Sequence, residues 1–335
     1  MASLREIKDR IGSVRSTLKI TSAMKLVASA KLRKAQKAIE GMRPYERTLA
    51  EILALLPAAV PSRADGNYFP DKFAEKPISA PPSTTPAHAA AAPDASHTTP
   101  AHAAAGKTAI VAIASNSSLC GGFNANVIRK TLETIRGCAG AVEVYPLGRK
   151  MAEALRRAGY TAPADYNELV AHPSYEKSSA LARTLAERFQ AGELSGVVLV
   201  YNRFASASRQ EPVAETYLPF YSEAPERAAG NYFSDKFAEK PISAPPSTTP
   251  AHASDYILEP DAEALAAQLL PQVMMLKFHA AILDSAAAEQ AARTIAMQTA
   301  SDNAEDLLGE LTLEYNKGRQ QKITSEILDL LGGAQ

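Results

Sequence analysis

The chain has 335 residues, 46% of them apolar, and its 36 basic and 36 acidic residues leave no formal net charge. This composition excludes a chain that is disordered throughout, and it argues against a protein that works by bulk attraction to nucleic acid or to an anionic membrane. The charged start MASLREIKDR is unlike a signal peptide, and the longest apolar run, Ile52 to Val60, is far shorter than the ~20 residues that span a bilayer. The sequence therefore predicts a cytoplasmic chain without direct membrane insertion.

The first predicted element is a long helix within residues 1–60. Its apolar residues recur at alternating steps of three and four, which is the heptad pattern of a coiled coil. The pattern comprises Leu4, Ile7, Ile11, Val14, Leu18, Ala28, Leu32, Ala35, Ile39, Met42, Leu49, Leu53 and Leu56. It is interrupted at Thr21, Lys25 and Glu46, and Pro44 is a position where the helix could bend. A single helix over this stretch would be about 80 Å long.

Two low-complexity segments, residues 61–106 and 224–254, are rich in Ala, Pro, Ser and Thr. They share a duplicated block: GNYFPDKFAEKPISAPPSTTPAHA from Gly66 recurs from Gly230 with one change, Pro70 to Ser234. Their proline-rich parts cannot bury enough apolar surface to offset the entropy of ordering. For the aromatic start of each block, packing on the neighbouring domain and complete disorder both remain open.

Between these segments, residues 107–223 alternate between strand-like and helical patterns. Strands are predicted at 108–114, 142–147, 197–201 and 212–220, and helices at 124–136, 149–158 and 177–190. Such alternation is typical of helices packed on both faces of a mostly parallel sheet. The sequence therefore predicts a small, doubly wound, Rossmann-like α/β domain.

The last predicted element is a second long helix within residues 255–335, which begins after the start signal Glu259-Pro260-Asp261. Its length would be on the order of 100 Å, far beyond that of an ordinary globular helix. The helical period is carried by Leu265, Leu269, Val273, Leu276, Leu283, Ala287, Leu308, Leu311, Tyr315, Ile323, Ile327 and Leu330. Alanines crowd its middle, from Ala286 to Ala304, and small side chains let two helices approach closely.

The two terminal helices are predicted to pair with each other. Residues 1–40 are strongly basic, whereas the last helix is acidic on balance from Asp284 onward, and opposite charges beside two apolar seams favour association. Two separate amphipathic helices remain the alternative from the pattern alone. The basic helix could also bind nucleic acid, but its apolar seam needs a partner first, so a partner helix and an acidic protein surface are favoured.

The sequence contains no pattern that requires a catalytic site or a cofactor. Gly106-Lys107-Thr108 is similar to the end of a phosphate-binding loop, but Ala101 stands where that motif needs glycine, and the triplet opens a strand. The loop from Leu119 to Asn124 precedes a helix, where α/β proteins hold phosphates, but it lacks the spaced glycines of that site. A structural turn capped by Asn124 is favoured. The histidines and the two cysteines show no spacing typical of a metal site or a nucleophile.

Three stretches of the sequence resemble the gamma subunit of F-type ATP synthases. The first contains the run Lys19-Ile20-Thr21-Ser22-Ala23-Met24-Lys25-Leu26-Val27-Ala28, and the second is the loop Leu119-Cys120-Gly121-Gly122-Phe123-Asn124. The third and most specific covers residues 296–334, including Leu311-Thr312-Leu313-Glu314-Tyr315-Asn316-Lys317 and Ile323-Thr324-Ser325-Glu326-Ile327-Leu328-Asp329. The resemblance covers the whole chain except the two low-complexity segments.

The resemblance implies that the terminal helices run antiparallel. The expected fold class is thus α/β, with a long antiparallel coiled coil of the N- and C-terminal helices and a central Rossmann-like domain. It also implies a non-catalytic rotor subunit, the central stalk, which couples ion translocation through the membrane sector to conformational change in the catalytic beta subunits. The implied partners are three alpha and three beta subunits, the epsilon subunit and the c-ring. The implied location is peripheral, on the cytoplasmic side of the inner membrane, and no cofactor or metal is implied.

By the same resemblance, five residues are expected to contact the beta subunits. Met24 and Lys25 lie where the heptad pattern breaks and a polar surface is expected to face acidic beta loops. Arg319, Gln320 and Thr324 match a hydrogen-bonding contact with a beta loop. From the pattern alone, each could instead be a solvated position of the coiled coil.

Two other functions remain as alternatives: a structural coiled-coil scaffold, and a nucleotide-dependent α/β enzyme with helical arms. A scaffold would not co-purify with alpha, beta and epsilon subunits, and equilibrium dialysis against ATP and NAD would test the enzyme.

Overall fold

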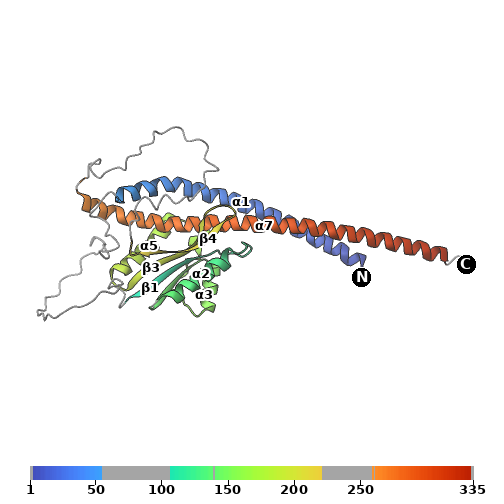
Figure 1. Cartoon of the computed structure of the whole chain (residues 1–335), viewed down its shortest axis with the longest axis horizontal. Helices are drawn as coiled ribbons and strands as arrows, with labels where there is room; N and C mark the ends of the chain where they lie inside the picture. Colours follow the sequence, from blue (N-terminus) through green and yellow to red (C-terminus); the bar gives the residue numbers. More distant parts are fainter. Residues whose placement is uncertain (1–2, 55–105, 139, 221–258, 260, 333–335) are drawn as a thin grey trace, which may run out of the picture.

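The computed structural model describes residues 3–54, 106–138, 140–220, 259 and 261–332. Two long helices, α1 (Leu4–Ala54) and α7 (Ala262–Gly332), lie side by side, and an α/β domain packs against one end of the pair (Figure 1). Along the chain the domain consists of β1 (Lys107–Ile113), α2 (Phe123–Gly137), β2 (Val142–Leu147), α3 (Arg149–Arg157), α4 (Asn167–Ala171), α5 (Tyr175–Gln190), β3 (Leu194–Phe204) and β4 (Gln210–Leu218). The low-complexity segments predicted at 61–106 and 224–254 lie outside the described residues, apart from Gly106. The boundaries of the five predicted regions therefore stay predictions.

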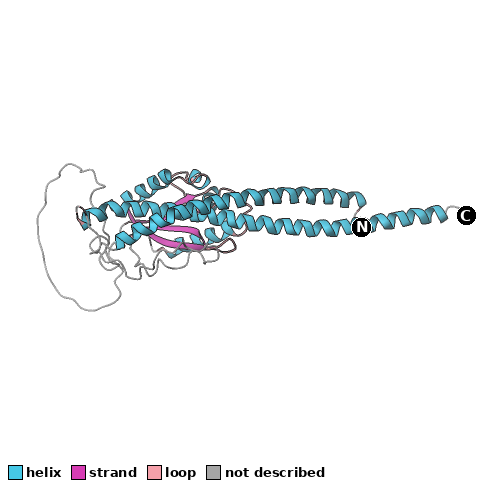
Figure 2. Cartoon of the chain, turned by 90° about the horizontal axis from the view of Figure 1, so that it is seen from above, coloured by secondary structure: helices cyan, strands magenta, loops and turns pink. Residues whose placement is uncertain are grey.

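Helices α1 and α7 run antiparallel, so the ends of both helices that lie near the chain termini are at the tip far from the α/β domain (Figures 1 and 2). Their 51 and 71 residues correspond to helices about 77 Å and 107 Å long. Leu4 lies against Gly318, and Thr21 lies beside Ser301, which defines the register. Residues 319–332 of α7 therefore extend beyond the start of α1, as about 20 Å of helix without a partner helix.

Burial along the seam confirms most of the predicted heptad. Buried positions include Ile7, Ala28, Ile39, Leu49 and Leu53 on α1 and Val273, Leu276, Leu283, Ala287 and Leu311 on α7. The pattern fails at the tip, where Ile323 and Ile327 are 47% and 51% exposed. The physical reason is that α1 begins at Leu4, so these two positions have no facing helix to cover them.

The opposite charges of the two helices do not pair across the seam in the basic part of α1. None of the basic side chains between Arg5 and Lys37 makes an ion pair within the part of the chain that the structure describes. Lys25 instead donates from Nζ to the neutral Gln298 Oε1 at 2.6 Å. The predicted charge attraction therefore does not take the form of paired side chains, and the basic groups of α1 stay on its outer side.

The alanine-rich middle of α7 is the place where the three parts of the molecule meet. One cluster of buried side chains joins Ile39 of α1, Ala287, Ala288, Ala291 and Ala292 of α7, and Cys120, Phe123 and Phe204 of the α/β domain. Small side chains let α7 contact α1 on one side and the domain on the other. This helix contains a window with a mean hydropathy of 1.2, apolar enough for a membrane span, but 56% of the window is buried inside the structure. Its apolar character is therefore explained by internal contacts.

The sheet has four strands in the order β2-β1-β3-β4, with β1 parallel to both neighbours and β4 antiparallel to β3. Ile110 of β1 stands in register with Val144 of β2 and Val198 of β3. All four predicted strands are confirmed, although β3 spans 194–204 and extends beyond the predicted 197–201 on both sides. The α4 helix was missed, because its 5 residues are too few to display a helical period.

Helices cover both faces of the sheet, which confirms the doubly wound arrangement (Figure 1). On one face, α2 and α3 contribute Val127, Ile135, Met151 and Leu155. On the other face, α5 contributes Leu181, Leu185 and Phe189, and α7 contributes Leu270, Met274 and Phe278. The domain therefore has a core that a terminal helix completes, and it is not independent of the coiled coil.

A charged cluster lies where α5 meets β2. Arg188 donates to both carboxylate oxygens of Glu143, at 2.7 and 3.1 Å, and its Nε donates to Glu193 at 2.8 Å. The hydroxyl of Tyr145 also donates to Glu143, at 2.7 Å. Chiefly through the hydrogen bonds from Arg188, the pKa of Glu143 is lowered to about 2.

This cluster predicts an acid-sensitive part of the stability. Because the folded pKa lies below the ordinary value of 4.5, ionised Glu143 stabilises the fold above that pH, and the contribution is lost as the pH falls toward 2. We expect Glu143→Gln to lower the free energy of unfolding at pH 7 by about 2–3 kcal/mol, and to lose less stability than the wild type between pH 5 and 3. Urea unfolding followed by circular dichroism at each pH measures both effects.

The matched control is Glu133→Gln, because Glu133 only pairs with the exposed Arg129 at 3.9 Å, and surface pairs contribute little. It should behave like the wild type at every pH. If Glu143→Gln lost as much free energy of unfolding between pH 5 and 3 as the wild type, the prediction would be contradicted.

Candidate partner-contact surface

Where the heptad pattern of α1 is interrupted, two polar side chains make hydrogen bonds to α7. Thr21 is buried, with its Oγ1 2.8 Å from Ser301 Oγ, and the hydrogen bond of Lys25 to Gln298 lies one turn further along. Because the buried hydroxyl of Thr21 finds a partner across the seam, its burial costs little. Met24 and Lys25 are both half-buried. Thr21 thus faces α7, whereas the bond from Lys25 to the exposed Gln298 lies at the solvent-accessible edge of the seam, so an outward polar surface at Met24 and Lys25 stays a prediction.

Large apolar side chains face solvent at the same level of the shaft. We define the neck surface as Ile20, Leu26 and Val27 of α1, Leu119 of the β1–α2 loop and Ile295 of α7, which are between 41% and 69% exposed. The register of the two helices places Ile295 at the level of Val27. Gly121, in the loop of Leu119, lies against the neighbouring Ala296. Exposed large apolar side chains from three elements at one level of the helix pair are candidates for contact with a partner.

The β1–α2 loop is held by side-chain hydrogen bonds from Asn124. Its Oδ1 accepts from the Ser115 N–H at 3.1 Å, and its Nδ2 donates to Ser115 Oγ at 2.8 Å and to the Ser117 carbonyl at 3.3 Å. The sequence predicted Asn124 as a helix cap, and this is wrong: α2 begins at Phe123, and Gly122 at the cap position makes no side-chain bond. Asn124 is the second residue of the helix, and its side-chain amide reaches back and holds the loop.

Helix α7 holds the same loop through a buried ion pair. Arg293 donates from Nη1 to Glu289 Oε1 and from Nη2 to Ser117 Oγ, both at 2.7 Å, and the two charged side chains are each 10% exposed. Within this loop Leu119 has a φ of 65°, which is unusual for leucine. A residue keeps this unfavourable backbone conformation when the surrounding contacts hold it there, and such residues are often found at functional sites. The loop, which Asn124 and Arg293 hold by hydrogen bonds, therefore presents Leu119 to solvent.

The other predicted contact residues lie on the unpartnered tip of α7. Arg319, Gln320 and Thr324 are all exposed, and Thr324 Oγ1 donates to the Gln320 carbonyl at 2.9 Å. Gln320 and Thr324 are one turn apart and share a face, whereas Arg319 is about 100° away around the helix. From Gln298, beside Lys25, to Arg319 the helix rises about 30 Å. The five predicted residues thus form two separate regions, at the neck and at the tip.

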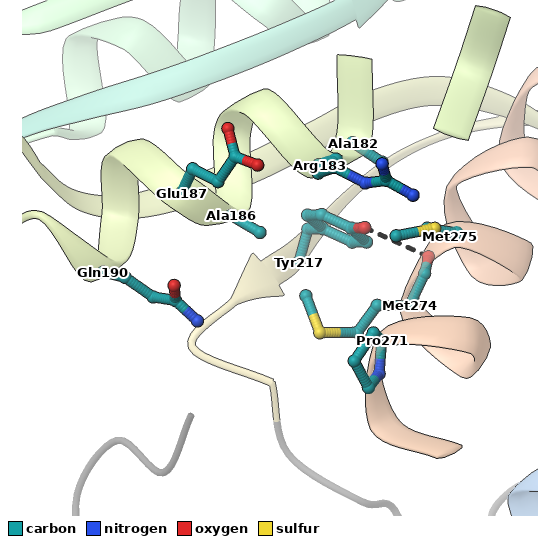
Figure 3. Close-up of a pocket in the computed structure, with 9 residues that line it drawn as sticks. All are labelled: Ala182, Arg183, Ala186, Glu187, Gln190, Tyr217, Pro271, Met274 and Met275. Carbon is teal, nitrogen blue, oxygen red and sulfur yellow. Dashed lines mark hydrogen bonds between the residues drawn. The ribbon is translucent and has the colours of Figure 1, made fainter. Parts of the chain in front are cut away.

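Within the described residues, no group of His, Cys, Asp and Glu side chains could hold a metal ion. A small hollow lies between α5, β4 and α7 (Figure 3), lined by Ala182, Arg183, Ala186, Glu187, Gln190, Tyr217, Pro271, Met274 and Met275. The hydroxyl of Tyr217 donates to the Met274 carbonyl at 3.0 Å, so this polar group is used within the fold. The lining is mostly alanine, methionine and proline, and it assembles no catalytic group of side chains.

Comparison with known proteins assigns the chain to a family. A family model described as ATP synthase matches residues 3–335. The ATP synthase gamma chains of Phocaeicola vulgatus and Bacteroides fragilis are each 41% identical to this chain, over 338 and 339 residues, which cover 100% of this chain and 99% of theirs. The chain belongs to the ATP synthase gamma chain family. The family resemblance seen in the sequence is therefore confirmed.

Two solved structures share the fold of this gamma-family chain. The rotor of Euglena gracilis mitochondrial ATP synthase in rotational state 1 matches with a TM-score of 0.56 at 17% identity, over 96% of this chain and 98% of that chain. A second chain, from the OSCP/F1/c-ring structure of the same enzyme in rotational state 3, matches with a TM-score of 0.57 at 16% identity, over 99% and 93%. At this identity the likeness concerns the fold alone.

Sequence reasoning missed the apolar part of the neck surface. Ile20 and Val27 were read only as parts of a family motif, and Leu119 only as part of a glycine-containing turn. The sequence did contain a signal for this surface. Large apolar residues stand at positions outside the apolar heptad seam, next to polar residues at positions that belong to the seam. The contact roles of Met24, Lys25, Arg319, Gln320 and Thr324 stay predictions.

Proposed function

We propose that this chain is the rotor shaft, or central stalk, of an ATP synthase. It couples ion translocation through the membrane sector to conformational change in the catalytic beta subunits, and it has no active site of its own. The observation that carries the proposal is a long antiparallel helix pair with an α/β domain at one end and a single-helix tip at the other, in a gamma-family chain. Three alpha and three beta subunits surround the coiled coil, and the epsilon subunit and the c-ring bind at the end with the α/β domain. The chain is peripheral, on the cytoplasmic side of the membrane.

The uneven charge of the shaft supports this role. Between the neck and the tip, α1 exposes Lys8, Arg10, Arg15 and Lys19, whereas α7 exposes Asp302, Glu305, Asp306, Glu310 and Glu314. A shaft with one basic and one acidic side presents a different surface to each of three surrounding beta subunits. A contact shifts the equilibrium between two conformations of a beta subunit only when its free energy differs between them. Because each beta subunit meets a different side of the shaft, each rotational position can favour a different conformation of each catalytic site.

The neck and the tip supply the proposed contacts with the beta subunits. At the neck, Met24 and Lys25 lie beside the apolar side chains of the neck surface, so the matching beta loop has apolar as well as acidic groups. At the tip, Arg319, Gln320 and Thr324 have their polar groups in solvent and available for hydrogen bonds to a beta loop. The Leu119 loop is a third proposed contact, at the level of the neck.

The tip tests the proposed function. Replacing Arg319 and Gln320 together by alanine removes one charge-assisted and one neutral hydrogen bond, each worth roughly 1–3 kcal/mol. We expect assembly with alpha and beta subunits to persist and ATP synthesis in inverted membrane vesicles to fall about tenfold or more. The control is Gln321→Ala with Lys322→Ala, which removes one amide and one cation from neighbouring positions of the same exposed tip.

The experiment distinguishes a wrong contact role of the tip from a wrong proposed function. Unchanged ATP synthesis in the Arg319/Gln320 double variant would contradict the contact role of the tip. A wild-type chain that does not assemble with alpha and beta subunits, or that hydrolyses ATP alone, would contradict the proposed function itself.

A further inference from the structure

Hydrogen bonds at three levels connect α7 to the α/β domain. They join Tyr217 to the Met274 carbonyl, Ser178 to His279 and Ser117 to Arg293, at 3.0, 2.9 and 2.7 Å. Arginine stays protonated at every physiological pH, and the pKa of the buried Tyr217 is raised further by burial. Only the middle connection contains a group that ordinarily titrates between pH 5 and 8.

The surroundings of His279 suit a neutral imidazole. His279 is 8% exposed, and its Nδ1 lies 2.9 Å from the fully buried Ser178 Oγ. Ser178 Oγ also donates to the Tyr175 carbonyl at 2.9 Å. Because a hydroxyl has one hydrogen, this leaves His279 Nδ1 as the donor in their contact, and Nε2 carries no proton. The Tyr175 ring stands edge-on to the imidazole, with 5.7 Å between ring centroids.

Among the described residues, no anion offsets the cost of a positive charge at this position. The titratable and charged groups on the elements that pack here are Tyr175, Glu176 and Lys177 of α5, Glu168 of α4, Lys277 and Asp284 of α7, and Tyr45 and Glu46 of α1. Glu168 is already paired with Lys177 at 2.6 Å. Burial alone lowers the pKa of His279, with no contribution from any of these charges.

We propose that His279 is an acid-sensitive link between α7 and the α4–α5 side of the α/β domain. Protonation places an uncompensated charge in the α5–α7 contact and gives Nε2 a hydrogen without an acceptor among the described residues, so α4 and α5 loosen from α7. The neutral form is the one that the fold favours. The contribution of neutral His279 to the stability of the fold is therefore complete above the ordinary histidine pKa of 6.5, and it is lost as the pH falls below that value. The device requires only the chain itself and would make attachment of the domain to α7 respond to acidification.

Hydrogen exchange of the full chain tests this link. After correction for intrinsic exchange rates, we expect amide protection across 167–190 to fall about threefold or more between pH 7.5 and 5.5. Protection across 123–137, on the opposite face of the sheet, should stay constant. His279→Asn retains a hydrogen-bonding nitrogen near the Nδ1 position but cannot titrate, so it should abolish the pH response. His172→Asn, at an exposed histidine, is the matched control and should retain it.

A direct titration keeps the proposal falsifiable if the His279→Asn variant folds poorly. The His279 imidazole resonances of the wild-type chain, assigned among the six histidines by their nuclear Overhauser contact with the Tyr175 ring, should show a pKa below 6.5. A His279 pKa at or above 6.5 would overturn the proposal. So would an equal loss of α4–α5 protection in the wild type and in a folded His279→Asn variant.

Discussion

Replacing Gly148 with alanine is expected to prevent the α/β domain from folding. Gly148 lies between β2 and α3 with a φ of 102°, a conformation that costs an L-residue about 1–3 kcal/mol. In addition, a Cβ at this position would overlap Ala114 O and lie 2.8 Å from Ala114 C, at the end of β1. These are backbone atoms of the residue directly after the central strand β1, which cannot rotate away, so overpacking adds about 1–3 kcal/mol or more. The sum is a large fraction of the roughly 5–15 kcal/mol by which domains are stable.

The matched control for this prediction is Gly159→Ala. Gly159 also has a positive φ, of 89°, but nothing lies within 4 Å of the added Cβ. The control therefore separates the effect of backbone strain from that of the steric collision. Gly159→Ala should lower the free energy of unfolding only by the strain. Urea unfolding followed by tyrosine fluorescence measures both variants, since the sequence has 12 tyrosines and no tryptophan. A Gly148→Ala chain as stable as Gly159→Ala would show that the collision is relieved by a backbone shift.

Replacing Arg293 with alanine is expected to destabilise the chain by about 3–5 kcal/mol. The substitution leaves the carboxylate of Glu289 buried, with Gln290 Nε2 at 3.4 Å as its remaining hydrogen-bond donor among the described residues. It also removes the donor to Ser117 Oγ and so releases the β1–α2 loop from α7. Urea unfolding of the purified chain gives the change in stability. Limited proteolysis in the loop reports its release.

Replacing both members of the pair is the control. Glu289→Gln combined with Arg293→Met retains similar volumes without a buried charge, and replacing a buried ion pair in this way is often nearly neutral. We expect the double variant to be more stable than Arg293→Ala, with the loop still released. A double variant as unstable as Arg293→Ala would mean that the loss comes from packing or from the loop contact, and not from an unpaired carboxylate.

The coiled coil and the sheet could be predicted from the sequence because each follows from a local period. Heptad steps such as Ile7 to Ile11 to Val14 describe one face of one helix, and the apolar run of β1 describes a strand buried on both faces. Neither inference requires knowledge of a distant segment. The family followed from motifs of the same local kind, at both ends of the chain.

The polar contacts could not be predicted, because each one depends on the alignment of distant segments. Thr21 looked like an interruption of the heptad, yet it meets Ser301, 280 residues away, in a buried hydrogen bond. The roles of Arg293 and His279 depend in the same way on where the α/β domain lies against α7. A single side chain on a helix carries no information about its partner until the register is known.

The sequence by itself thus determined the family, the two long helices, the strands and the doubly wound plan of the domain. The tertiary structure decided which side of α1 faces α7 around Thr21, which backbone conformation exposes Leu119, and that α7 completes the core of the domain. The physical reason is the range of the forces involved. A hydrophobic period is a property of one segment and can be recognised there. Hydrogen bonds and buried ion pairs require two atoms to lie within about 3 Å of each other, and for distant segments only the folded chain brings such atoms together.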